Sequence, residues 1–143
     1  MKKKFTHIQK VFYALIVVFL VLVFYFIVPV PTSAKRMFFP IVAVLAILFF
    51  ILGAVLIRFT LKSKIEKNLK TFLLLTGFSA VGFLVCTLLH NFFYGLAVIT
   101  EHIILLKYLM ESLHVMFFLV SIIVCPILFL IGMIGGIYKF LKK

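Results

Sequence analysis

The sequence predicts an all-α integral membrane protein, a bundle of four transmembrane helices in one domain. Hydrophobic residues make up 66% of the 143 residues, whereas soluble domains are nearer half apolar. The excess is gathered into four blocks, each long enough to cross a bilayer at about 20 residues per helix. The polar connections are too short for a soluble domain, so a single membrane domain over residues 1–143 is expected. The predicted spans are approximately 11–28, 38–57, 71–94 and 115–138.

The charged residues predict how these helices are oriented. The chain has 15 basic and 3 acidic residues, a net charge of +12, and nearly all of them lie outside the apolar blocks. Twelve of the basic residues fall in the leader, the connection before the third span and the tail. This positive-inside pattern predicts that both termini are cytoplasmic. The clusters form no soluble basic face for nucleic acid, so we expect the lipid bilayer to be their partner.

The first two spans are separated by a proline-rich connection. The first apolar run, 11–28, is longer than the roughly 7–15 residues of a signal-peptide core, so we expect it to be retained. Pro29, Pro31 and Pro40 bracket the connection that follows it. Since proline cannot continue a helix but fits its first turn, we expect proline to end the first helix and start the second.

The third span carries a face of small and polar residues. These residues recur at steps of three and four, so they form one stripe on a helix. Small and polar side chains gain nothing from contact with lipid, so the stripe should pack against other helices. Its members are Thr76, Ser79, Gly82, Cys86 and His90.

The fourth span carries a matching stripe that ends in a GxxxG step, a spacing that allows close backbone approach. We expect Pro126 to kink this helix or to free the carbonyl near Ile122. If the two stripes pack together, counting residues places Cys125 about 9 Å deeper than Cys86, too far for a disulfide. We therefore expect both cysteines to serve in packing. The stripe consists of His114, Ser121, Cys125, Gly132 and Gly136.

Residues 96–113 are expected to form an outward amphipathic segment between the third and fourth spans. Thr100, Lys107, Glu111 and His114 fall within about 60° of one another on a helix. Such a segment either lies on the membrane surface or extends a neighbouring span.

His90 and His114 should lie at similar depth near the outer boundary, which makes them the candidate site. Two facing imidazoles could bind a transition metal or ligate haem axially, with His102 and Glu111 as further ligands. The simpler interpretation is that each histidine bonds a backbone carbonyl or water. No HxxxH or HExxH spacing is present, so no cofactor is predicted.

Several functional groups are missing from the spans, and this narrows the possible function classes. No Asp, Glu, Lys or Arg lies in the middle of a span, although a proton-coupled transporter usually needs such a group. No nucleophile lies beside a base, so hydrolysis is unsupported. The leading hypothesis is a non-enzymatic accessory or protective subunit, comparable to bacteriocin-immunity proteins or transporter partners. It would act through helix–helix contacts with a membrane-protein partner or a second copy. The alternatives are a haem- or metal-binding redox protein and a small homo-oligomeric channel lined by the third-span stripe, although no filter motif is visible.

The second half of the chain resembles small four-helix prokaryotic membrane proteins of uncharacterised activity. This resemblance implies the four-helix architecture and a prokaryotic plasma membrane, and it implies no activity. The residues that carry it are Thr76, Gly77, Gly82, His90, Asn91, Tyr94, Cys125 and Pro126.

Overall fold

The computed structural model describes residues 2–142, which form long helices joined by short turns. Within this part of the chain, four helices are long and apolar enough to cross a membrane, as expected of an integral membrane protein. The prediction of an all-α protein with four such helices is therefore confirmed. The last of the four, Ile104–Leu141, contains a five-residue π-helical turn. The elements are α1 (Lys2–Ile27), α2 (Thr32–Leu61), α3 (Lys67–Ile99), α4 (Ile104–Leu119), η1 (Val120–Val124) and α5 (Cys125–Leu141).

The helices are longer than the spans predicted from hydropathy, and this changes the segment between the third and fourth spans. Residues 96–113 complete α3 and begin α4, with only residues 100–103 between the two helices. Of the two arrangements expected for this segment, the structure shows the second, in which it extends the neighbouring spans. The 33 residues of α3 measure about 50 Å, well beyond the roughly 30 Å of a bilayer hydrocarbon core.

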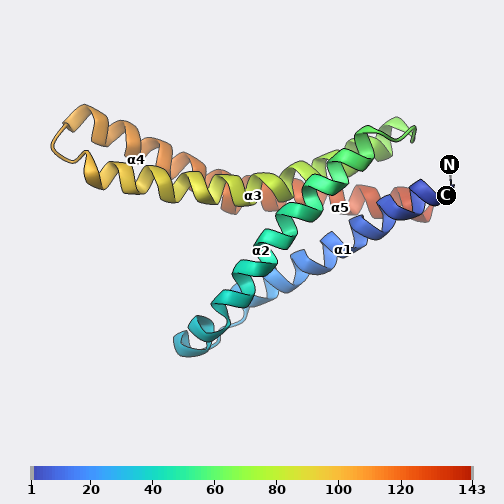
Figure 1. Ribbon diagram of the computed structural model, residues 1–143, viewed down its shortest axis with the longest axis horizontal. Coiled ribbons are helices and arrows are strands. Elements are labelled where there is room, and N and C mark those ends of the chain that lie inside the picture. The colour runs from blue at the N-terminus through green and yellow to red at the C-terminus, as the bar shows by residue number, and fades with distance from the viewer. Residues whose placement is uncertain (1, 143) are drawn as a thin grey trace.

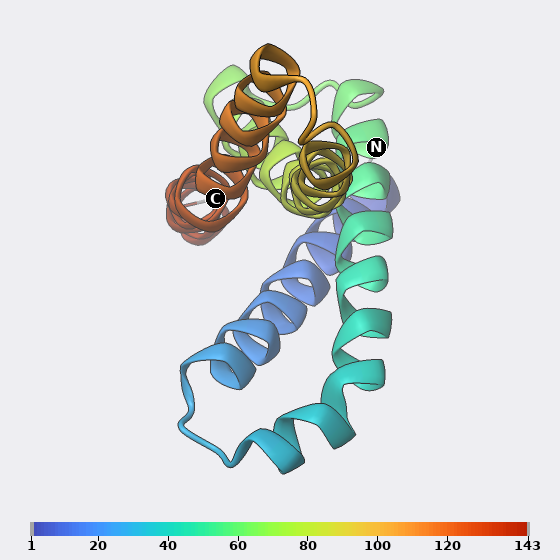
Figure 2. The ribbon, with the colours of Figure 1, turned by 90° about the vertical axis from the view of Figure 1, so that its left-hand side faces the viewer.

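The start of α2 also differs from the prediction. α2 begins at Thr32, directly after Pro31, and Pro40 lies inside the helix. The helix is longer at its N-terminus than the predicted span of 38–57, because Pro31, with ψ of 145°, already forms its N-terminal boundary. Pro40 has no N–H, so the carbonyl four residues earlier loses its helical donor. Figure 2 shows the first turns of α2 bent relative to the rest of the helix.

Pro126 disturbs the fourth span as its chemistry requires. A proline in a helix removes the hydrogen bond to the carbonyl four residues earlier. Here the chain forms the π turn η1 just before it, in which the Cys125 N–H donates to the Val120 carbonyl. Pro126 then occupies the first turn of α5. The wider turn lets the helix continue past the proline.

Two helical hairpins, α1–α2 and α3–α4, diverge toward their turns, as Figures 1 and 2 show from two directions. The start of α1, the α2–α3 connection and the end of α5 lie together at the opposite end of the molecule (Figure 1). α3 packs along α2, α4 and α5 and is the central element. The three segments that hold most of the basic residues therefore share one end of the bundle.

An aromatic cluster joins α1, α2 and α5. The ring of Phe129 lies 4.2 Å from that of Phe19 and 5.3 Å from that of Phe49, centroid to centroid. Phe129 and Phe49 are almost fully buried. Because each buried aromatic side chain removes a large apolar area from its surroundings, this cluster forms the centre of the core.

Glycines bring the backbones of α2 and α3 into direct contact. A Cβ on Gly53 would lie 3.0 Å from the Gly77 carbonyl oxygen, and a Cβ on Gly77 would lie 3.1 Å from the Gly53 carbonyl oxygen. Any larger residue at either position would push the helices apart. Small residues have this role at helix contacts in membranes, where lipid supplies no hydrophobic drive for association.

The GxxxG step of α5 serves two neighbours within the same chain. A Cβ on Gly132 would lie 2.8 Å from the backbone nitrogen of Thr76 in α3. A Cβ on Gly136 would lie 2.6 Å from the ring of Phe12 in α1. Both glycines are buried. The step therefore allows close packing inside the monomer.

Candidate functional site

The two stripes of small and polar residues pack inside the bundle. Their hydroxyl groups donate to carbonyls three or four residues earlier in their own helices, over 2.7 to 2.9 Å. This back-bonding satisfies the hydroxyls without a partner helix. Because the buried members are enclosed within one chain, they are not exposed to line a pore between copies. Of the stripe residues, Thr76, Ser79, Ser121, Cys125, Gly132 and Gly136 are buried, whereas Gly82 and Cys86 are half-buried.

Cys86 and Cys125 lie together, so the predicted separation of about 9 Å is wrong. The Cys125 sulfur packs against α3 at Gly82, one turn from Cys86, where an added Cβ would lie 3.2 Å from it, and both thiols are free. A side chain on a helix leans toward the N-terminus of its own helix. In antiparallel helices this lean moves the two thiols toward each other, and η1 further shortens the path from His114 to Cys125. A count of residues along straight helices includes neither effect.

His90 and His114 meet face to face between α3 and α4. Their rings stack with centroids 4.1 Å apart and planes 22° from parallel. Each Nδ1 lies 3.2 Å from the backbone carbonyl oxygen of the other histidine. A carbonyl can only accept a hydrogen bond, so it is the Nδ1–H of each ring that donates. The pair thus forms a reciprocal clasp between the two helices.

Further aromatic rings extend this stack along the hairpin. The ring of Phe118 lies 5.1 Å from that of His90, and the ring of Tyr94 lies 5.2 Å from that of His114. Stacked and tilted aromatic pairs at such distances add to the free energy of association beyond their buried area. The four rings therefore hold α3 and α4 together beyond the region where the other helices pack.

A shallow groove of about 400 Å³ opens beside His114 near the turn of the hairpin. Glu111 lies in its lining, and its carboxylate is 3.9 Å from the Lys107 ammonium. His102 is exposed in the turn and is not part of this lining. The structure therefore places Glu111 beside His114 and leaves His102 outside. The groove is lined by Tyr94, Ala97, Val98, Glu101, Lys107, Glu111, His114 and Val115.

The stacked rings of His90 and His114 are not arranged as a pair of axial ligands on either side of one ion. Axial haem ligation places the iron between two imidazoles, with metal–nitrogen bonds of about 2 Å on either side. Rings already in contact leave no room for that group. The lone pair of each Nε2 lies in the plane of its own ring, and two nearly parallel planes do not direct their lone pairs to one ion. Residues 2–142 contain no cluster of three His, Cys, Asp or Glu side chains that could hold a metal ion.

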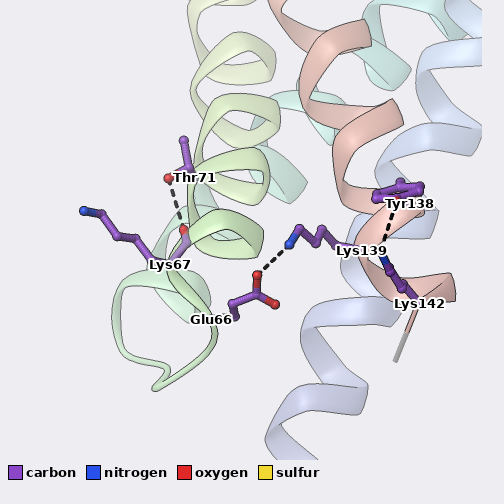
Figure 3. Close-up of polar contacts among 6 residues, drawn as sticks. All are labelled: Glu66, Lys67, Thr71, Tyr138, Lys139 and Lys142. Carbon is purple, nitrogen blue, oxygen red and sulfur yellow. Dashed lines mark hydrogen bonds and ion pairs between the residues drawn. The ribbon is translucent and has the colours of Figure 1, made fainter.

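One polar contact at the other end of the bundle could not be predicted from the sequence. Lys139 near the end of α5 donates to Glu66 at the start of α3 over 2.6 Å. Figure 3 shows the two side chains pointing toward each other across the gap between these helices. The two residues are 73 positions apart, so only the antiparallel packing of α3 and α5 brings them together.

The fold and these contacts define a four-helix membrane bundle in which the side-chain hydroxyls bond within their own helices and a few polar pairs join one helix to another. No protein-family model, curated protein or solved structure matches the chain. The resemblance to small prokaryotic membrane proteins therefore rests on the residues quoted for it.

Proposed function

We propose that this chain is a non-enzymatic accessory or protective membrane protein that acts through helix–helix contacts with another membrane protein. The observation that carries this proposal is the exposure of α4. In α4 no residue is buried, and it packs mainly along α3. Large apolar side chains such as Leu105 and Tyr108 are more than half exposed. A helix that contributes so little to its own core has a free face for a partner helix.

Polar residues of the same hairpin lie next to the exposed face of α4 and should favour association with a partner helix. The groove beside His114 carries Glu101, Lys107 and Glu111 next to the apolar surface of α4. In a membrane, polar groups on an otherwise apolar helix favour association because they find partners on a neighbouring helix. We expect the partner helix to place complementary polar groups at this level.

The proposed orientation follows from the positions of the basic segments. The leader, the α2–α3 connection and the tail lie at one end of the bundle (Figure 1), and together they contain twelve basic residues. The positive-inside rule assigns that end to the cytoplasm. Both termini are then cytoplasmic, in a prokaryotic plasma membrane, and the α3–α4 turn lies on the outer side.

Site-specific photo-crosslinking in native membranes tests the proposal. A photoreactive residue replaces Tyr108 on α4, and the matched control replaces Phe24, a similarly exposed residue on α1. We expect a discrete protein adduct at position 108 and lipid adducts alone at position 24. Lipid adducts alone at both positions would contradict the proposal. An adduct of twice the mass of the chain would instead identify the partner as a second copy.

A further inference from the structure

A second groove, of about 520 Å³, lies between the start of α3 and the end of α5. It is at the end of the bundle where the basic segments meet. Its lining divides by depth, because the residues near the helix ends are polar and those one turn further in are apolar. The polar part contains Asn68, Thr71, Tyr138 and Lys139, and the apolar part contains Phe72, Ile134 and Gly135.

The polar part of the groove carries an excess of positive charge. Lys139 is paired with Glu66, the acidic residue at the start of α3. Lys142 is held beside the groove by Tyr138, with its Nζ 3.3 Å from the hydroxyl oxygen and 5.6 Å from the ring centroid. Figure 3 shows Lys139 and Lys142 on neighbouring turns of α5, and Lys67 directed away from that helix. Glu66 is thus paired with Lys139, and Lys142 adds a second positive charge beside Tyr138.

The neutral polar groups of the groove are hydrogen-bond donors. The Tyr138 hydroxyl accepts from Lys142, so its own proton remains available to a ligand. The Asn68 side-chain amide carries two further donor hydrogens. Ammonium groups together with neutral donors are suited to the oxygens of a phosphate group, which only accept when fully ionised.

We propose that this groove binds one anionic phospholipid, with its phosphate against Lys142, Tyr138 and Asn68 and an acyl chain along the apolar part. Basic pockets between transmembrane helices at the cytoplasmic side recognise such headgroups. A free phosphate ion would gain nothing from Phe72 and Ile134, whereas a lipid uses both parts of the lining. The site is independent of the proposed helix–helix function, because it lies at the end of the bundle opposite the α3–α4 turn.

Native mass spectrometry of delipidated protein in neutral detergent tests this site. The protein is titrated with dioleoyl phosphatidylglycerol, with the same concentration of dioleoyl phosphatidylcholine, and with phosphatidylglycerol in the presence of excess inorganic phosphate. Lys142→Gln removes the charge at the groove. Lys64→Gln is the matched control, because Lys64 is exposed in the α2–α3 connection at the same end of the molecule. Far-UV circular dichroism checks that both variants keep their helices.

We expect phosphatidylglycerol to be retained in preference to phosphatidylcholine. Its affinity should fall about fivefold in Lys142→Gln and less than about twofold in Lys64→Gln. Tyr138→Phe should also weaken binding, since it removes a donor without changing the charge. Equal losses in the two lysine variants would overturn the site in favour of diffuse charge attraction. Equal retention of the two lipids, or displacement by inorganic phosphate, would overturn it as well.

Discussion

Replacement of His90 should lower the free energy needed to open the α3–α4 hairpin. The geometry of the histidine clasp allows the size of this change to be worked out. Each histidine contributes one Nδ1–H bond of 3.2 Å to the opposite carbonyl, at the long end of the hydrogen-bond range. Polar contacts between membrane helices average about 0.6 kcal/mol. The ring stack adds about 0.8 kcal/mol, within the range for aromatic pairs. The carbonyls keep their own helical donors in every variant, so no buried acceptor is left unpaired.

These values separate two substitutions at one position. His90→Phe keeps the stack and loses one bond, so hairpin opening becomes easier by about 0.6 kcal/mol, or about threefold. His90→Ala loses the bond and the stack, about 1.4 kcal/mol, or about tenfold. In a double-alanine variant with His114 the stack is lost only once. The two effects should therefore fall short of additivity by about 0.8 kcal/mol.

Hydrogen exchange of the backbone amides, followed by mass spectrometry, measures this local opening directly. His102→Ala is the matched control, because His102 is exposed in the turn of the same hairpin. Its exchange should remain near that of the unmodified protein. If His90→Ala and His102→Ala exchange at the same rate, the clasp contributes nothing and the energetic reasoning is refuted.

Three further predictions test the packing of the bundle. Gly77→Ala should destabilise the protein by about 1–3 kcal/mol in reversible unfolding, because its Cβ would lie 3.1 Å from a backbone carbonyl of α2. Gly95→Ala, with no atom within 4 Å of the added Cβ, should be neutral or slightly stabilising, and equal losses would contradict this packing. Thr60→Val should stabilise the protein by about 1 kcal/mol, because within the described chain the Thr60 hydroxyl is buried without a hydrogen-bond partner; a loss of that size would indicate an unseen partner. Mild iodine oxidation should join Cys86 to Cys125 within one chain, as read by protection from alkylation, and full alkylation of both thiols afterwards would show that they do not lie together.

The local properties of the sequence determined the four helices. The hydropathy of a segment depends only on its own consecutive residues. The apolar blocks therefore identify the membrane-crossing helices without knowledge of the helices that pack beside them. The small and polar stripe of α3 was also readable, because helical periodicity places its residues on one face. The helix ends were less accessible. The polar residues near 96–113 depart from a simple apolar run, although all of this segment except the turn at residues 100–103 is helical.

Only the tertiary structure decided how these faces meet. Cys86 and Cys125 come together because side chains of antiparallel helices lean toward one another and η1 shortens the path, which counting along straight helices cannot include. His90 and His114 were expected at similar depth, but their stacking depends on the distance between α3 and α4 and on ring orientation. Such details arise from contacts between residues far apart in the chain, whereas composition and periodicity describe each helix alone.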